Sequence, residues 1–237
     1  MRSSPIDSLR RNHSRLSMEV SWLSGLCRIG VFYDGSYVSY AQRHYYYDKA
    51  VGWLDLRAFH TLVEGFVRGK EPNYPDHKIV YAAWFQGSFP SAKAAEKQLR
   101  FDRNLQHDMM HAGIELKYLP MSTSRGEKGV DVALAVDALC LGLSGKVDVV
   151  VLVTGDGDFV PLARELFKNG IRVAAAYFNY EAKDHPSYAS DRLLSTVNYQ
   201  LDVSSLETDK ARLSVFNSLF RPSDQDHKGQ HRGQEVQ

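Results

Sequence analysis

Residues 147–162 read VDVVVLVTGDGDFVPL, an apolar run that stops at two aspartates, Asp156 and Asp158, separated by one glycine. A short apolar run that is rich in β-branched residues and bounded by turn residues is typical of a strand buried on both faces, as in parallel sheets. In open α/β sheets, ligands bind outside the carboxyl ends of the strands. The stretch therefore predicts a buried strand that ends in acidic groups at a ligand-binding edge of the sheet.

Other segments of the chain alternate between strand and helix character. The strand candidates are residues 28–33, 77–85, 114–119, 147–153 and 171–178, and the helical candidates are residues 55–68, 91–112, 130–143 and 159–168. Alternation of this kind is typical of a parallel sheet with helices on both faces. We expect an α/β fold of three layers, in which a central, mostly parallel sheet is flanked by helices.

The composition is that of an ordinary soluble protein of 237 residues with a formal net charge of +1, which gives no overall attraction to nucleic acid. Two cysteines far apart in the sequence, and no apolar run long enough to span a membrane, favour a reduced, cytoplasmic protein without a membrane partner. We expect one domain over residues 28–203. It follows a disordered or wrongly assigned leader (1–27) and precedes a polar, partly disordered tail (204–237).

Acidic residues recur where the predicted strands end. Asp34 follows the first strand, and Asp131 lies in the first turn of the helix that starts after a glycine-rich turn. With Asp156 and Asp158 these make four carboxylates from three segments, which we expect to meet at one edge of the sheet. Two unit charges about 6 Å apart repel by roughly 3 kcal/mol at an effective dielectric near 20, so such a cluster needs protons or cations.

Oxygen ligands of this kind suit the hard cations Mg²⁺ and Mn²⁺. The chemistry that follows is phosphodiester hydrolysis by a metal-activated water. Each acid also has a structural explanation on its own, because Asp158 is a credible N-cap for the following helix, and Asp156-Gly157 and Asp34-Gly35 are ordinary turn pairs. The prediction of a metal site depends on the four acids as a set.

Three motifs together resemble the NYN domain of the LabA-like group, within the PIN-like nuclease superfamily. They are VFYDGS (31–36), KGVDVALAVDAL (128–139) and VTGDGDFVPLARELFKNGIRV (153–173), and the resemblance runs from about Ile29 to Leu201. It implies a PIN-like, Rossmann-like fold and a divalent-metal-dependent ribonuclease that acts on RNA. The implied catalytic and metal-binding residues are Asp34, Asp131, Asp156 and Asp158.

Further residues are expected to contact phosphate or to support the acids. Lys128 matches the lysine of the second motif, and Thr154 stands where the family often has a small hydroxyl residue; we expect both to bind RNA or phosphate, with Ser36 and Arg125. The expected supporting residues are Asp137, six residues after Asp131, and Tyr37. The family's first motif usually reads D-G-x-N, and Tyr37 stands in place of that asparagine. This departure keeps a catalytically weak RNA-binding or regulatory module as an alternative, and a metal-dependent phosphatase as a third.

Single-stranded RNA needs contacts beyond the acids. Helix 91–112 carries three basic residues along one face: Lys93, Lys97 and Arg100. This face either binds phosphate or is simply solvated. Tyr37, Tyr40 and Tyr45–Tyr47 either stack on unpaired bases or pack a loop. The chain does not decide between a monomer and a homodimer.

The motif HDMMH, residues 107–111, places two histidines four residues apart on a predicted helix, a spacing that suits zinc. They share a polar helix face with Arg100 and Asn104, and no third ligand is evident. We therefore do not expect zinc chemistry at this motif.

Overall fold

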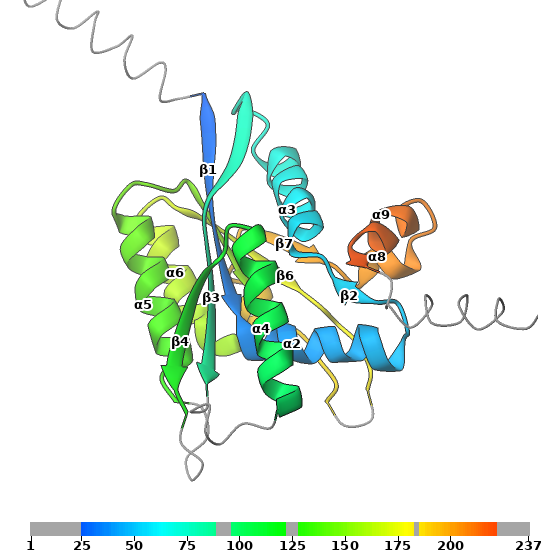
Figure 1. Cartoon of the computed structure of the whole chain (residues 1–237). Coiled ribbons are helices and arrows are strands. Elements are labelled where there is room, and N and C mark those ends of the chain that lie inside the picture. Colours follow the sequence, from blue (N-terminus) through cyan, green and yellow to red (C-terminus); the bar gives the residue numbers. More distant parts are fainter. Residues whose placement is uncertain (1–24, 89–95, 122–127, 183–184, 222–237) are drawn as a thin grey trace, which may run out of the picture.

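The computed structural model describes residues 25–88, 96–121, 128–182 and 185–221. Its main feature is a six-stranded sheet in the order β4-β3-β1-β5-β6-β7 (Figure 1). The strands are β1 (Leu26–Asp34), β3 (Asp76–Ser88), β4 (Glu115–Pro120), β5 (Val149–Val153), β6 (Arg172–Tyr177) and β7 (Tyr199–Asp202). Every neighbouring pair in this sheet is parallel. The five predicted strands are confirmed, and β7 is an additional edge strand.

Helices cover both faces of the sheet, which confirms the three-layer α/β fold. One face packs against α5 (Val130–Leu143) and α6 (Val160–Lys168), and the other against α2 (Gly35–Arg43), α3 (Leu56–Lys70) and α4 (Glu96–His111). The two faces follow from strand periodicity, because successive side chains of a strand point to opposite sides. Val149, Val151 and Val153 of β5 join one core, and Val150 and Leu152 join the other.

The helices begin largely where the sequence predicts. Asp55 caps α3 by accepting hydrogen bonds from the backbone N–H groups of Arg57 and Ala58. The α4 helix is described from Glu96, so the expected start at residue 91 lies outside the described residues. One detail was wrong: Asp156, not Asp158, provides the cap before α6. Asp156 Oδ1 accepts from the Asp158 N–H at 2.9 Å at the start of a 3-10 turn, Gly157–Phe159.

The folded part continues beyond residue 203. Residues 205–221 form α8 (Ser205–Thr208), α9 (Leu213–Ser218) and β8 (Phe220–Arg221), and β8 pairs antiparallel with β2 (Trp53–Leu54). Phe216, Leu219 and Phe220 are buried in the same core as α3. The expected polar tail therefore does not begin at residue 204. At the other end, β1 begins at Leu26, inside the expected leader.

The tyrosines that follow α2 pack against other residues of the fold. They lie in a π-helical turn, His44–Asp48, where Tyr45 is buried in the core and Tyr46 stacks on Trp53 with ring centroids 4.4 Å apart. Of the two interpretations of Tyr45–Tyr47, packing describes these two residues, and Tyr47 is exposed. Among the described residues, no helix combines the length and the apolar character needed to span a membrane.

Candidate active site

Three of the four predicted acids line one hollow at the carboxyl edge of the sheet. Asp34 is the last residue of β1, and Asp156 follows β5, the direct neighbour of β1. Asp131 reaches the same place from the first turn of α5. The hollow has a volume of about 750 Å³. Parallel strands bring their carboxyl ends to the same edge, so acids from three distant segments share one space.

Thr154 joins two of these acids from the last position before the turn. Its buried hydroxyl donates to Asp34 Oδ2 at 3.2 Å and accepts the backbone N–H of Asp156 at 3.2 Å. The other oxygen of Asp34, Oδ1, accepts the N–H of Tyr37 at 3.0 Å and caps α2. The side chain of Asp34 is therefore held on both oxygens, and its position is fixed relative to Asp156.

Two glycines allow the backbone to place these acids. A Cβ at Gly35 would collide with the indole Nε1 of Trp84 and lie 2.6 Å from the carbonyl oxygen of Phe85, so only glycine fits directly after Asp34. Gly129 has a φ of +80° and precedes α5. This left-handed conformation is easily reached by glycine, and it sets the start of the helix whose first turn holds Asp131.

The remaining predicted residues lie in different surroundings. Ser36 lines the hollow, but Asp158 and Lys128 do not, although both are exposed. Asp137 faces another part of the molecule, where its Oδ2 accepts from the hydroxyl of Tyr81 at 3.0 Å. The expected phosphate contacts Arg125 and Lys93, and the side chains of Lys97 and Arg100, lie outside the described residues.

The hollow also has a wall that the sequence did not indicate. Residues from the segment after β6 line it: Pro186, Ser187, Tyr188 and Ser190. Tyr188 is 64% exposed, and Tyr40 of α2, on the same hollow, is 42% exposed. The only available signal was that this segment follows a strand, because its own residues show no motif.

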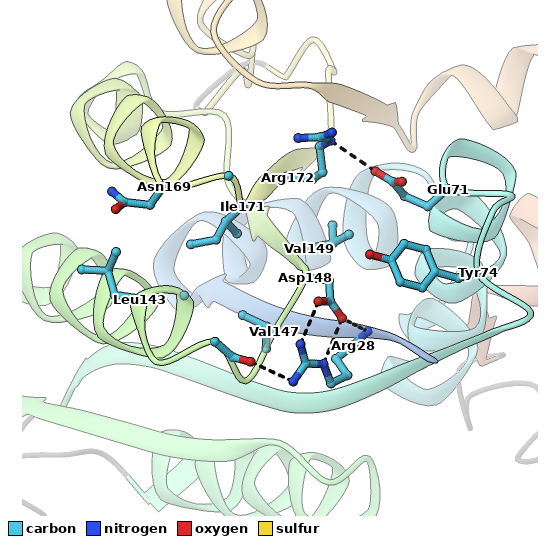
Figure 2. Close-up of a pocket in the computed structure, with 13 residues that line it drawn as sticks. Arg28, Glu71, Tyr74, Leu143, Val147, Asp148, Val149, Asn169, Ile171 and Arg172 are labelled. Atoms are coloured by element: carbon cyan, nitrogen blue, oxygen red, sulfur yellow. Dashed lines mark hydrogen bonds and ion pairs between the residues drawn. The ribbon is translucent and has the colours of Figure 1, made fainter. Parts of the chain in front are cut away.

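A second hollow lies at the opposite, amino edge of the sheet (Figure 2). There the guanidinium of Arg28 donates to both carboxylate oxygens of Asp148, at 2.9 and 2.8 Å, and to the carbonyl oxygen of Gly145 at 2.8 Å. Burial opposes ionisation of Asp148, but the hydrogen bonds from Arg28 outweigh it and lower the pKa of the carboxyl. The guanidinium donates hydrogen bonds to acceptors of the protein itself, so this cluster connects β1 to the start of β5.

Comparison with known protein families gives a match to the NYN domain over residues 28–203. The chain belongs to the NYN domain family. This places it in the PIN-like nuclease superfamily. Among solved structures, it is similar to a protein of unknown function from Vibrio parahaemolyticus, with 21% sequence identity and a TM-score of 0.50, covering 74% of this chain and 91% of the other. Comparison with curated proteins gave no match.

In this NYN domain, the side chain of Tyr37 contacts the end of β6. Its hydroxyl accepts the N–H of Phe178 at 2.8 Å and donates to the carbonyl oxygen of the same residue at 3.2 Å. Burial raises the pKa of this phenol well above its usual range, so it stays neutral. Tyr37 supports Asp34 through its backbone N–H, and its side chain forms part of the wall of the hollow.

The acids of the NYN domain do not surround a metal-binding position closely. Within the described part of the chain, no three His, Cys, Asp or Glu side chains converge closely enough to hold one metal ion. Mg²⁺ usually keeps several waters and binds through one or two carboxylates together with substrate phosphate. Asp34, Asp131 and Asp156 share a hollow that has space for water, so their oxygens fit a hydrated hard cation that is contacted partly through water.

Proposed function

We propose that this NYN domain protein is a divalent-metal-dependent ribonuclease that hydrolyses RNA phosphodiester bonds with water. The observation that supports this proposal most is the meeting of Asp34, Asp131 and Asp156 in one hollow at the carboxyl edge of the sheet. One or two of these carboxylates, together with water, would hold Mg²⁺ or Mn²⁺. When bound, such an ion lowers the pKa of a coordinated water and offsets the charge of the phosphate.

The residues of the chain have separate tasks in this proposal. Thr154 keeps Asp34 and Asp156 in a fixed relation through its two hydrogen bonds. Ser36 lies on the hollow, where its hydroxyl can donate to a phosphate oxygen, and Lys128 is exposed one residue before Gly129. Asp158 does not belong to the proposed ligand set, because it does not line the hollow with the other three acids.

We propose unpaired RNA as the substrate. Among the described residues that line the hollow, none is lysine or arginine. Among these lining residues, attraction of a polyanion therefore relies on the metal and on uncharged contacts. Tyr40 and Tyr188 expose aromatic rings on the same hollow, and stacking of a base on such a ring contributes about 1–3 kcal/mol. Bases in a duplex are already stacked on one another and are not available to these rings.

We also place the reaction in the cytoplasm. Both cysteines are free: Cys27 is buried and Cys140 is exposed. Unpaired cysteines agree with a reducing compartment.

Cleavage of end-labelled RNA tests the proposal. We expect Mn²⁺- or Mg²⁺-dependent cutting of a single-stranded oligonucleotide, its loss in EDTA, and much slower cutting of the same sequence in a duplex. Asp156→Asn removes one negative ligand and should lower the rate by at least about 100-fold. Asp191→Asn changes an exposed carboxylate of α7 (Asp191–Leu194) outside the hollow and is the matched control.

Two other results would contradict the proposal. RNA that is bound but not cut, with or without metal, would indicate a binding or regulatory module, the alternative that Tyr37 in the usual place of asparagine keeps open. Metal-dependent release of phosphate from small phosphomonoesters without RNA cleavage would indicate a phosphatase.

A further inference from the structure

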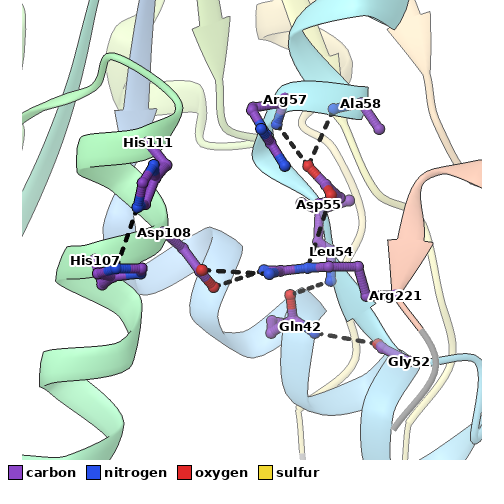
Figure 3. A network of polar contacts seen from close by, with 10 residues as sticks. All are labelled: Gln42, Gly52, Leu54, Asp55, Arg57, Ala58, His107, Asp108, His111 and Arg221. Atoms are coloured by element: carbon purple, nitrogen blue, oxygen red, sulfur yellow. Dashed lines mark hydrogen bonds and ion pairs between the residues drawn. The ribbon is translucent and has the colours of Figure 1, made fainter.

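Two histidines meet at the end of α4, on the surface away from the acid hollow. The Nε2 atoms of His107 and His111 are 3.1 Å apart, and the ring centroids are separated by 4.3 Å (Figure 3). Both rings are exposed and line a second, smaller hollow of about 290 Å³. The ribonuclease proposal uses neither residue.

The short distance limits how the rings can be protonated. A hydrogen bond between two ring nitrogens requires a proton on one of them and a lone pair on the other. At least one Nε2 lone pair therefore points into the space between the rings. A cation that replaced the shared proton would find both lone pairs directed at it.

The same distance fits two ligands of one transition-metal ion. Zinc binds histidine nitrogen at about 2.0–2.1 Å, which puts two nitrogens about 2.9 Å apart at a right angle and about 3.4 Å apart at a tetrahedral angle. The observed 3.1 Å lies between these values. The spacing of four residues on one helix puts both side chains on one face, so the backbone need not move.

The surroundings do not repel a cation. Asp108 points away from the rings and pairs with Arg221 at 2.6 Å, while Asp55 caps α3 and lies 3.7 Å from Arg221 (Figure 3). Arg57 is the other charged residue lining this hollow, so its two acids and two arginines balance. No third metal-binding side chain joins the pair among the described residues, which leaves the other coordination positions to water.

The sequence did not lead us to expect zinc here, but on this geometry we propose that His107 and His111 chelate a divalent transition-metal ion, Zn²⁺ or Ni²⁺, through both Nε2 atoms. Imidazole suits these ions, whereas the carboxylates of the acid hollow suit Mg²⁺ and Mn²⁺, so the two sites select different metals. The bound ion cross-links two successive turns of α4 and stabilises the C-terminal end of this helix.

Titration of the metal-free full chain with Zn²⁺ in excess Mg²⁺ tests this site, because the excess Mg²⁺ competes with Zn²⁺ for the carboxylates of the acid hollow. Nitrogen NMR of the histidine rings should show the Nε2 signals of His107 and His111 shifting together, and calorimetry should show a binding event that disappears in His107→Gln and in His111→Gln. Met110→Gln, at a 70% exposed residue of the same turn, should keep it.

Circular dichroism of each variant verifies that the helices remain folded. The proposal is overturned if neither ring signal responds to saturating Zn²⁺, or if both variants bind as much Zn²⁺ as the unaltered chain. Neither readout depends on RNA cleavage, so this result stands apart from the success or failure of the ribonuclease proposal.

Discussion

Replacement of Thr154 by valine tests whether the positions of Asp34 and Asp156 matter, because it removes the hydroxyl between them and leaves their charges unchanged. Valine has nearly the same shape as threonine but lacks the hydroxyl, and the residue is only 1% exposed, so the change removes two hydrogen bonds without leaving a cavity. One of these bonds goes to the carboxylate of Asp34, and the other comes from the N–H of Asp156.

The expected loss of stability follows from these two bonds. A hydrogen bond to a charged group contributes about 1.5–3 kcal/mol and a neutral one about 1 kcal/mol, and both are long at 3.2 Å. We therefore expect a loss of about 2–3 kcal/mol, which a domain stable by about 5–15 kcal/mol tolerates. In a chain of this size the melting temperature should fall by about 4–12 °C.

Activity should change more than stability. Residues that orient metal ligands typically affect metal affinity or rate by about 10–100-fold, and we expect Thr154→Val to lose cleavage within that range while it remains folded. Thr154→Ser keeps the hydroxyl and is the matched control. If Thr154→Val melts and cleaves like Thr154→Ser, the hydroxyl does not hold the acids in place, and the reasoning is wrong.

Two further predictions concern the stability of the fold. Gly35→Ala should destabilise the protein by about 1–3 kcal/mol or more in urea unfolding, because its Cβ would collide with Trp84 and lie 2.6 Å from the carbonyl oxygen of Phe85. Gly65→Ala in α3, where a Cβ meets no atom within 4 Å, should stabilise it by about 0.5–1 kcal/mol; equal effects of the two changes would contradict the packing described. The lowered pKa of Asp148 predicts a pH effect: its pairing with Arg28 stabilises the folded state above the ordinary carboxyl pKa of 3.8, and this contribution is lost as the pH falls through the lowered value. Urea midpoints measured from about pH 5 to about pH 3 should fall less in Asp148→Asn than in the unaltered chain, and parallel curves would show that this ion pair does not contribute.

The sequence predicted the helices and strands whose apolar residues recur regularly along the chain and are buried in the structure. The run of valines in β5 and the helical spacing in α3 and α5 are local signals, and their bounds agree with the structure within a few residues. β7, by contrast, has four residues, of which only Leu201 is buried, so it has little pattern to detect. Phe216, Leu219 and Phe220 lie in a short segment, LSVFNSLF (213–220), that is too brief to predict where it packs. Their burial depends on elements such as α3 and β2, which lie far away in the sequence.

The sequence predicted those parts of the candidate site that lie at the carboxyl ends of strands. Asp34 and Asp156 follow adjacent parallel strands, so topology alone brings them together. Which of Asp156 and Asp158 faces the hollow depends on the turn, and the sequence does not specify that Asp156 takes the capping position. Tyr188 lines the hollow because of how the segment after β6 lies over the edge of the sheet. No local sequence pattern predicts this placement.

The parallel order of the sheet has a consequence for synthesis of the chain. β1 lies in the middle of the sheet, yet one of its two partners, β5, is made much later. Asp34 and Thr154 are 120 residues apart. At about 5–20 residues per second, about 6–24 s pass on the ribosome before the threonine that fixes the first acid has even been added. A nascent chain therefore has no assembled acid hollow until about two thirds of its residues have been added.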